Sequence, residues 1–154
     1  MILMRKLLLF FIFISIIKSN AQVRQPENTA ALYDQLKTAK GEQRASLLLQ
    51  LARIEFPKLP DQSMAFTQEA LTIYRQENNE NGQADAMNSL ANMYRRKNNF
   101  TLAYELDSVS YALSRKNNYQ RGIAGASLNL VPNYMRSMEY QKALSYANEA
   151  IDAG

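Results

Sequence analysis

The chain has 154 residues, carries 18 Lys and Arg against 14 Asp and Glu, and contains no Cys, His or Trp. Without Cys and His it has no disulfide bonds, no thiolate nucleophile, no Ser-His pair and no imidazole ligand for a metal. Its length suits one domain with a real core, or a short array of repeats.

The segment 1–21 has the pattern of a secretory signal peptide. Arg5 and Lys6 precede an almost unbroken apolar run from Leu7 to Ile17, and small side chains lead to a predicted cleavage between Ala21 and Gln22. The alternative is an uncleaved membrane anchor, but a spanning helix needs roughly 20 apolar residues. We therefore expect an exported protein, periplasmic or secreted. Cleavage would leave 15 basic and 14 acidic side chains, a balance that gives no indication of nucleic-acid binding.

Residues 22–154 favour helices, because they are rich in Ala, Leu, Gln, Glu and Arg and poor in β-branched residues. Three segments, 75–79, 96–99 and 115–118, each begin with a basic residue and end with a pair of Asn residues. This pattern suits the C-terminus of a helix. Gly82, Thr101 and Gly122 are expected at turns or helix starts, and Asp61 at an N-cap. The pattern predicts seven helices joined by short connections into hairpins, at 27–40, 43–56, 61–77, 83–97, 101–116, 121–137 and 140–152.

The chain repeats itself, because 61–100 align with 101–140 without a gap. Eight aligned pairs are identical: Arg75/Arg115, Asn78/Asn118, Gly82/Gly122, Ala84/Ala124, Ala86/Ala126, Leu90/Leu130, Tyr94/Tyr134 and Arg96/Arg136. Such a period is typical of a stack of helix pairs.

Within each period one motif recurs. Met87-x2-Leu90-Ala91-x2-Tyr94 is matched by Ser127-x2-Leu130-Val131-x2-Tyr134 and weakly by residues 48–55. The motif resembles the first helix of the tetratricopeptide repeat, and Ala143–Ile151 resembles its second helix. The resemblance covers roughly 43–152, with a period of 40 in place of the usual 34 or so.

The resemblance implies an all-α, right-handed superhelix of antiparallel hairpins, with three pairs and one unpaired helix. A repeat domain over 22–154 behind a signal peptide is similar to the extracytoplasmic repeat regions of bacterial envelope sensors. Many of those continue into a membrane helix and a signalling domain, so we expect this domain to continue beyond residue 154.

In the tetratricopeptide family the first helix of each pair lines a concave groove. Asn and Arg side chains grip extended peptide backbone and carboxylates well. The residues that match groove positions, and are therefore the candidate partner-binding residues, are Arg53, Asn88, Asn92, Arg95, Asn129 and Arg136, accompanied by Leu49, Asp85, Ser89, Leu128 and Met135. The family's two-carboxylate clamp is not expected, because Leu49, Ser89 and Gly125 occupy three of its positions.

No catalytic residues, metal ligands or cofactor-binding motifs are predicted. We expect a non-enzymatic module that binds a peptide or a partner protein; the alternative is a structural spacer or scaffold without a ligand. Pro132 falls inside a predicted helix, as a hinge or as a tolerated kink. The helix at 140–152 has an apolar stripe that includes Leu144 and Ile151, which is expected to meet further chain, a second copy or a partner.

Overall fold

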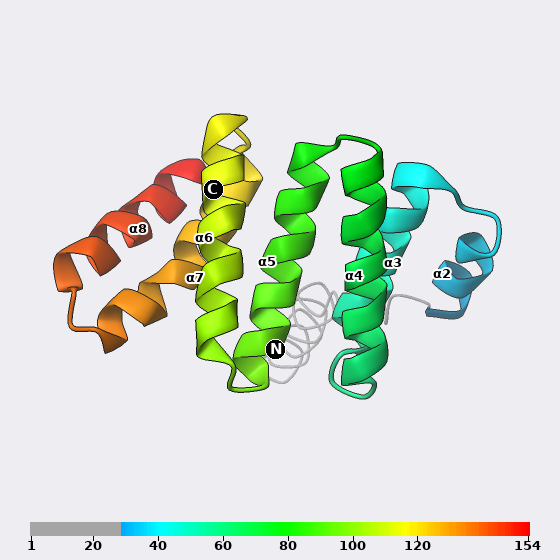
Figure 1. The fold of residues 1–154 in the computed structure, drawn as a ribbon, viewed down its shortest axis with the longest axis horizontal. Helices are drawn as coiled ribbons and strands as arrows, with labels where there is room; N and C mark the ends of the chain where they lie inside the picture. Colours follow the sequence, from blue (N-terminus) through cyan, green and yellow to red (C-terminus); the bar gives the residue numbers. More distant parts are fainter. Residues whose placement is uncertain (1–28) are drawn as a thin grey trace, which may run out of the picture.

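The computed structural model describes residues 29–154, and this part of the chain is entirely α-helical, with no strand (Figure 1). Its helices are α2 Thr29–Leu36, α3 Gly41–Glu55, α4 Pro60–Gln76, α5 Glu80–Arg96, α6 Phe100–Lys116, α7 Gln120–Arg136 and α8 Tyr140–Ala153. The seven predicted helices are confirmed, with ends that differ by a few residues. The predicted signal peptide, residues 1–21, lies outside the described residues. No described helix is long and apolar enough to cross a membrane.

Four of the connections share one turn, which recurs at a regular interval along the chain. Asn78, Asn98, Asn118 and Met138 all have a positive φ between 51° and 61°. The N–H of the residue after each donates to the carbonyl five positions earlier, as from Asn79 to Tyr74 at 2.9 Å. This left-handed ending satisfies carbonyls that the last helical turn leaves open. The prediction that Asn ends these helices is confirmed at three of the four turns.

The helix starts agree with the prediction except at α4. Asn79 and Asn99 are the N-caps of α5 and α6, and their side chains accept from the backbone N–H groups of Gly82 and Leu102. Gly82, Thr101 and Gly122 lie in the first turns of their helices, at the helix starts where they were expected, whereas Asp61, expected as an N-cap, lies inside the first turn of α4 because Leu59 is the N-cap. The Asn pairs at 78–79 and 98–99 each perform both tasks, since the first residue ends one helix and the second caps the next, whereas both residues of the pair 117–118 precede the N-cap of α7, Tyr119.

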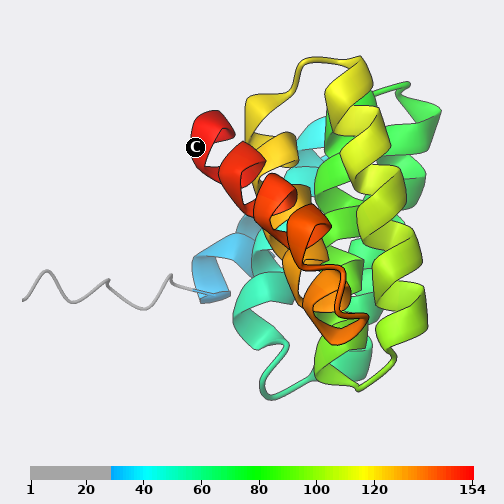
Figure 2. The same ribbon diagram turned by 90° about the vertical axis from the view of Figure 1, so that its left-hand side faces the viewer.

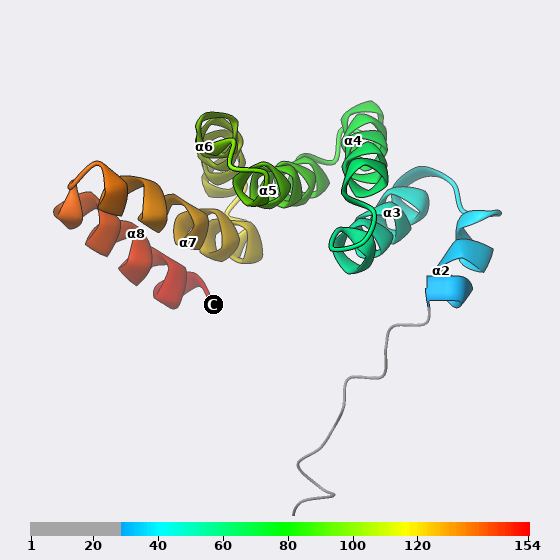
Figure 3. The same cartoon turned by 90° about the horizontal axis from the view of Figure 1, so that it is seen from below.

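The helices pack as three consecutive hairpins, α3 with α4, α5 with α6, and α7 with α8. The second helix of one hairpin packs on the first helix of the next, and α5 also contacts both α3 and α7. Seen from below, the helices follow an arc in which α4 and α6 lie on one side and α3, α5 and α7 on the other (Figure 3). The third hairpin, whose first helix contains Pro132, runs obliquely to the second (Figure 2). The short helix α2 packs against α3.

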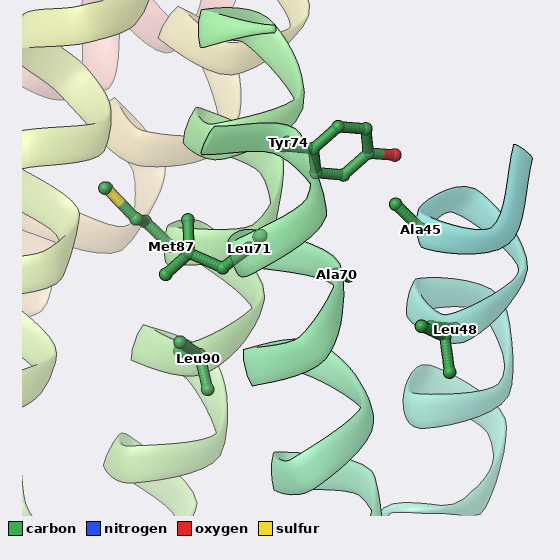
Figure 4. Packing of buried hydrophobic residues seen from close by; sticks show 8 residues of the cluster. Ala45, Leu48, Ala70, Leu71, Tyr74, Met87 and Leu90 are labelled. Carbon is green, nitrogen blue, oxygen red and sulfur yellow. The ribbon is translucent and has the colours of Figure 1, made fainter. Parts of the chain in front are cut away.

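The core follows the repeated motif. Leu48 of α3 and Leu90 of α5 point into one cluster with Leu71 and Tyr74 of α4 (Figure 4). Leu130, which corresponds to Leu90, is 1% exposed. The motif leucines of the first helices therefore face inward, as the sequence pattern indicates, whereas Leu144 and Ile151 of α8 are exposed.

Two glycines are buried where helices approach closely. A Cβ on Gly82 of α5 would lie 2.3 Å from the ring of Tyr74 in α4. A Cβ on Gly122 of α7 would lie 2.2 Å from Ser114 Oγ in α6. The repeated glycine thus marks the place where a second helix meets the next first helix, and only a hydrogen fits there.

Candidate groove on the first helices

An open groove of about 550 Å³ runs across the side of the arc that α3, α5 and α7 share. Its lining residues are Ser46, Leu49, Gln50 and Arg53 of α3, Tyr74 of α4, Asp85, Asn88, Ser89 and Asn92 of α5, and Arg121 and Gly125 of α7. Three of the candidate residues, Arg53, Asn88 and Asn92, are therefore brought together. A smaller pocket of about 150 Å³ shares Arg53 and Asn92 and adds the apolar floor of Phe56 and Met93.

Several lining residues are not among the predicted groove residues. Gln50 and Ser46 lie about one and two helical turns before Arg53, so the helical period around Arg53 could have found them. Arg121 lies in the first turn of α7 and lines the groove on the side of that helix. Tyr74 belongs to a second helix, and no groove rule based on first helices alone would have included it.

The polar residues of α5 form one continuous face. Asp85, Asn88, Ser89 and Asn92 follow each other at i, i+3, i+4 and i+7, which places them on the same side of the helix. Asn92 Nδ2 donates to Asn88 Oδ1 at 3.3 Å, and Ser89 Oγ donates to the carbonyl of Asp85 at 2.9 Å. This side of the groove is therefore a row of one carboxylate, one hydroxyl and two amides.

The charges that line the groove leave it positive. Arg53 and Arg121 are both exposed, and they stand against a single carboxylate, Asp85. Asp85 is half-buried and accepts from the hydroxyl of Tyr119 at 2.9 Å. Burial raises the pKa of the Asp85 carboxyl group. The pKa of the Tyr119 hydroxyl is raised to about 12, because this group is also buried and because it donates a hydrogen bond to Asp85. A groove with two guanidinium groups and one half-buried carboxylate favours an anionic ligand.

Two other candidates, Arg95 and Asn129, lie beside the groove in a buried network. Arg95 forms an ion pair with Asp107 of α6, and it also donates to the carbonyl of Asn129 at 3.1 Å and to Asn92 Oδ1 at 2.8 Å. Asn129 Nδ2 donates to Asp107 Oδ1 at 3.1 Å and to Asn88 Oδ1. The network ties α5, α6 and α7 together and holds the two groove asparagines in place.

Asp107 is the centre of this network and was not predicted. Its side chain is 0% exposed and that of Arg95 is 20% exposed. Burial raises the pKa of Asp107 to about 6, although Arg95 and the two hydrogen bonds oppose that rise. A shift of 40 residues aligns Asp107 with Thr67 and Ala147. Comparison of the repeats could therefore have singled out Asp107 as an acidic residue at a position that is uncharged in the other repeats.

Arg136, the sixth candidate, lies elsewhere. Its guanidinium sits over the ring of Phe100, 4.0 Å from the centroid, and Arg96 sits over Phe56 in the same way at 4.8 Å. The two arginines occupy the same position of successive repeats, so Arg136 corresponds to Arg96 and not to Arg95. These cation–π contacts join successive hairpins at their corners.

Among residues 29–154, no three acidic side chains gather in a way that could hold a metal ion. Comparison with protein-family models, with curated proteins and with solved structures finds no match to this chain. Function must therefore be inferred from the packing of the helices and the chemistry of the groove.

Proposed function

We propose that the protein is an exported, tetratricopeptide-like interaction module whose groove binds an extended peptide segment of a partner protein. The observation that carries this proposal is the groove itself, in which three successive first helices contribute polar side chains, amides and guanidinium groups among them, to one surface. In this proposal residues 22–154 form a right-handed superhelix of hairpins, have no catalytic role and act as the sensor part of a larger envelope protein.

The packing order supports the superhelix. Each second helix packs on the next first helix, and the first helices α3, α5 and α7 also touch one another in sequence. That arrangement is the one that stacked helical hairpins adopt, and it makes a continuous inner surface. The groove is lined mainly by residues of α3, α5 and α7. These helices lie on the inner side of the arc (Figure 3).

The spacing of the amides fits an extended peptide. Asn88 and Asn92 are one helical turn apart, which is about 6 Å along the helix. Alternate residues of an extended chain are about 6.6 Å apart, so both side chains can meet successive backbone groups on one edge of a peptide. An amide both donates and accepts, and it therefore pairs with backbone N–H and C=O alike. Arg53 and Arg121 then favour acidic side chains or a free terminal carboxylate.

The first prediction concerns this selectivity. The protein is titrated, by fluorescence anisotropy, with a labelled library of short acidic peptides that carry either a free or an amidated C-terminus. We expect saturable binding, and we expect the double variant Arg53→Gln, Arg121→Gln to weaken it about 10-fold or more, because hydrogen bonds to charged groups contribute about 1.5–3 kcal/mol each.

The matched control is Arg75→Gln, which removes an exposed arginine of α4 that lies outside the groove. It should bind like the wild type. Equal affinity of all three proteins would contradict the groove, and an absence of saturable binding throughout would favour the alternative of a structural spacer.

We also propose that the protein self-associates through α8. Leu71 of α4 is 3% exposed beneath the next hairpin, whereas its counterpart Ile151 in α8 is 75% exposed and Leu144 is 56% exposed. Burial of each would contribute up to roughly 2 kcal/mol. A second copy of α8 offers the same stripe and can cover both side chains at once.

The second prediction tests that contact. Sedimentation of the wild type over a concentration series should show association, whereas Leu144→Gln with Ile151→Gln should stay monomeric. The helix content should not change, because neither side chain belongs to the core of its own molecule. A wild type that remains monomeric at every concentration would rule out this interface.

A further inference from the structure

A separate pocket of about 250 Å³ lies at the turn between α7 and α8. It is lined by Tyr104 of α6, Asn133 and Tyr134 of α7, and Ser137 and Glu139 of the turn. The rings of Tyr104 and Tyr134 stand at 82° with centroids 6.1 Å apart, and their hydroxyl oxygens are 3.2 Å apart. None of these residues lines the groove, so the pocket is independent of the proposed function.

The repeat explains why this corner is hollow. At a shift of 40, Asn133 replaces Met93 and Ser137 replaces Lys97. Met93 is buried, and Lys97 extends across its corner to pair with Asp61 at 2.9 Å. Two long side chains are thus exchanged for two short polar ones. The exchange also leaves Asn133 Nδ2 buried and without a hydrogen-bond partner, although buried polar groups are rarely left unpaired.

The walls of the pocket already hold an ammonium group. Lys142 Nζ lies 5.5 Å from the centroid of Tyr134 and forms an ion pair with Glu139. Aromatic faces attract cations, and the carboxylate adds a charge-assisted hydrogen bond. The Lys142 side chain is 61% exposed and that of Glu139 is 42% exposed, and exposed pairs of this kind are weak. An ammonium group from another molecule can therefore take the place of Lys142.

We propose that this pocket binds the primary ammonium group of a lysine-like ligand, with Glu139 and the rings of Tyr104 and Tyr134 as its receptors. Because Nδ2 of Asn133 is buried, the Asn133 side chain turns toward the pocket on binding and its amide then donates to a carbonyl of the same ligand. The volume is below the roughly 300–1,000 Å³ of sites for drug-sized molecules, so it suits one side chain or one small amine. Lys142 acts as a tethered competitor that keeps the affinity low.

The test titrates the full chain with Nα-acetyl-lysine amide, and in a second arm with butylamine, while amide NMR signals are followed. Nα-acetyl-norleucine amide is the matched neutral probe. We expect saturable shifts at Ser137 and Glu139 with the lysine probe and none with the norleucine probe. Binding of butylamine equal to that of the lysine probe would identify a free amine as the ligand, and weaker binding would identify a lysine side chain, for which Asn133 contributes.

Two variants change the affinity in opposite directions. Glu139→Gln should weaken binding at least five-fold, because it removes the anionic receptor and keeps the shape. Lys142→Gln should strengthen it about two- to five-fold, the range that corresponds to the loss of an exposed ion pair. Both positions are exposed, and circular dichroism should confirm an unchanged fold.

The groove variant Arg53→Gln, Arg121→Gln should bind the lysine probe normally, which separates this site from the groove. The proposal is overturned if neither amine shifts these signals, if the norleucine probe shifts them equally, or if neither pocket variant alters the affinity.

Discussion

Replacing Asp107 by Ala should lower the free energy of unfolding by about 3 kcal/mol, as expected when one partner of a buried ion pair is removed. The change leaves Arg95, whose side chain is only 20% exposed, without its carboxylate. It also removes one acceptor of Asn129 Nδ2. Urea unfolding at pH 7, followed by circular dichroism, measures the loss.

The matched control is the double variant Arg95→Met, Asp107→Ala. Met135 and Ala147 are the residues that the third hairpin carries at these two positions, so the pair copies a combination that the chain itself uses. Because the uncompensated charge is removed as well, the double variant should recover most of the loss. If it were as unstable as the single variant, the ion pair would not be the cause.

The same carboxyl group should make stability depend on pH. The pKa of Asp107 is about 6 in the folded chain, against an ordinary value of 3.8. Between these values the folded protein binds more protons than the unfolded protein, so this contribution to stability falls as the pH rises from about 4 to about 6. The stability difference between wild type and Asp107→Ala should therefore be larger at pH 4 than at pH 8. A difference that grows with pH would contradict the raised pKa.

Gly82→Ala should destabilise the chain by about 2 kcal/mol, in the range that overpacked cores show. The added methyl group would lie 2.3 Å from the ring of Tyr74, which is 7% exposed and held in the core. This clash outweighs the gain of about 1 kcal/mol that Ala brings to a helix interior. Thermal unfolding measures the result, and Gly122→Ala should behave similarly because its methyl group would meet Ser114 and Tyr119.

Gly125→Ala is the matched control for both. Its methyl group would meet only the end of the Asn88 side chain, at 2.5 Å, so this flexible side chain has to shift and its hydrogen bonds with Asn92 and Asn129 have to adjust. We expect a stability within about 1 kcal/mol of the wild type, since the gain in helix propensity offsets the small shift. If all three glycine variants lost the same stability, close approach of the helices would not explain the repeated Gly82 and Gly122.

Local chemistry was enough to predict the helices and much of the core. An Asn of each pair ends a helix, and in two of the three pairs the second Asn also caps the next helix, so the turns could be located from the chain itself. Leu90 and Leu130 are buried because the helical period brings every third or fourth position to one side. For the same reason the groove face of α5, with Asn88 and Asn92, could be predicted from spacing alone.

Only the tertiary structure decided which polar residues turn inward. Arg95 and Asn129 have the same groove signature as Asn92, but they meet Asp107, which lies on a different helix from either of them. The guanidinium group of Arg136 lies over the ring of Phe100, which belongs to the preceding hairpin. Helical periodicity tells which face a residue occupies, whereas the crossing of neighbouring helices sets which partner that face meets. The buried network, the close approach at Gly82 and the pocket beside Asn133 all depend on that crossing, and for that reason no pattern within one helix could reveal them.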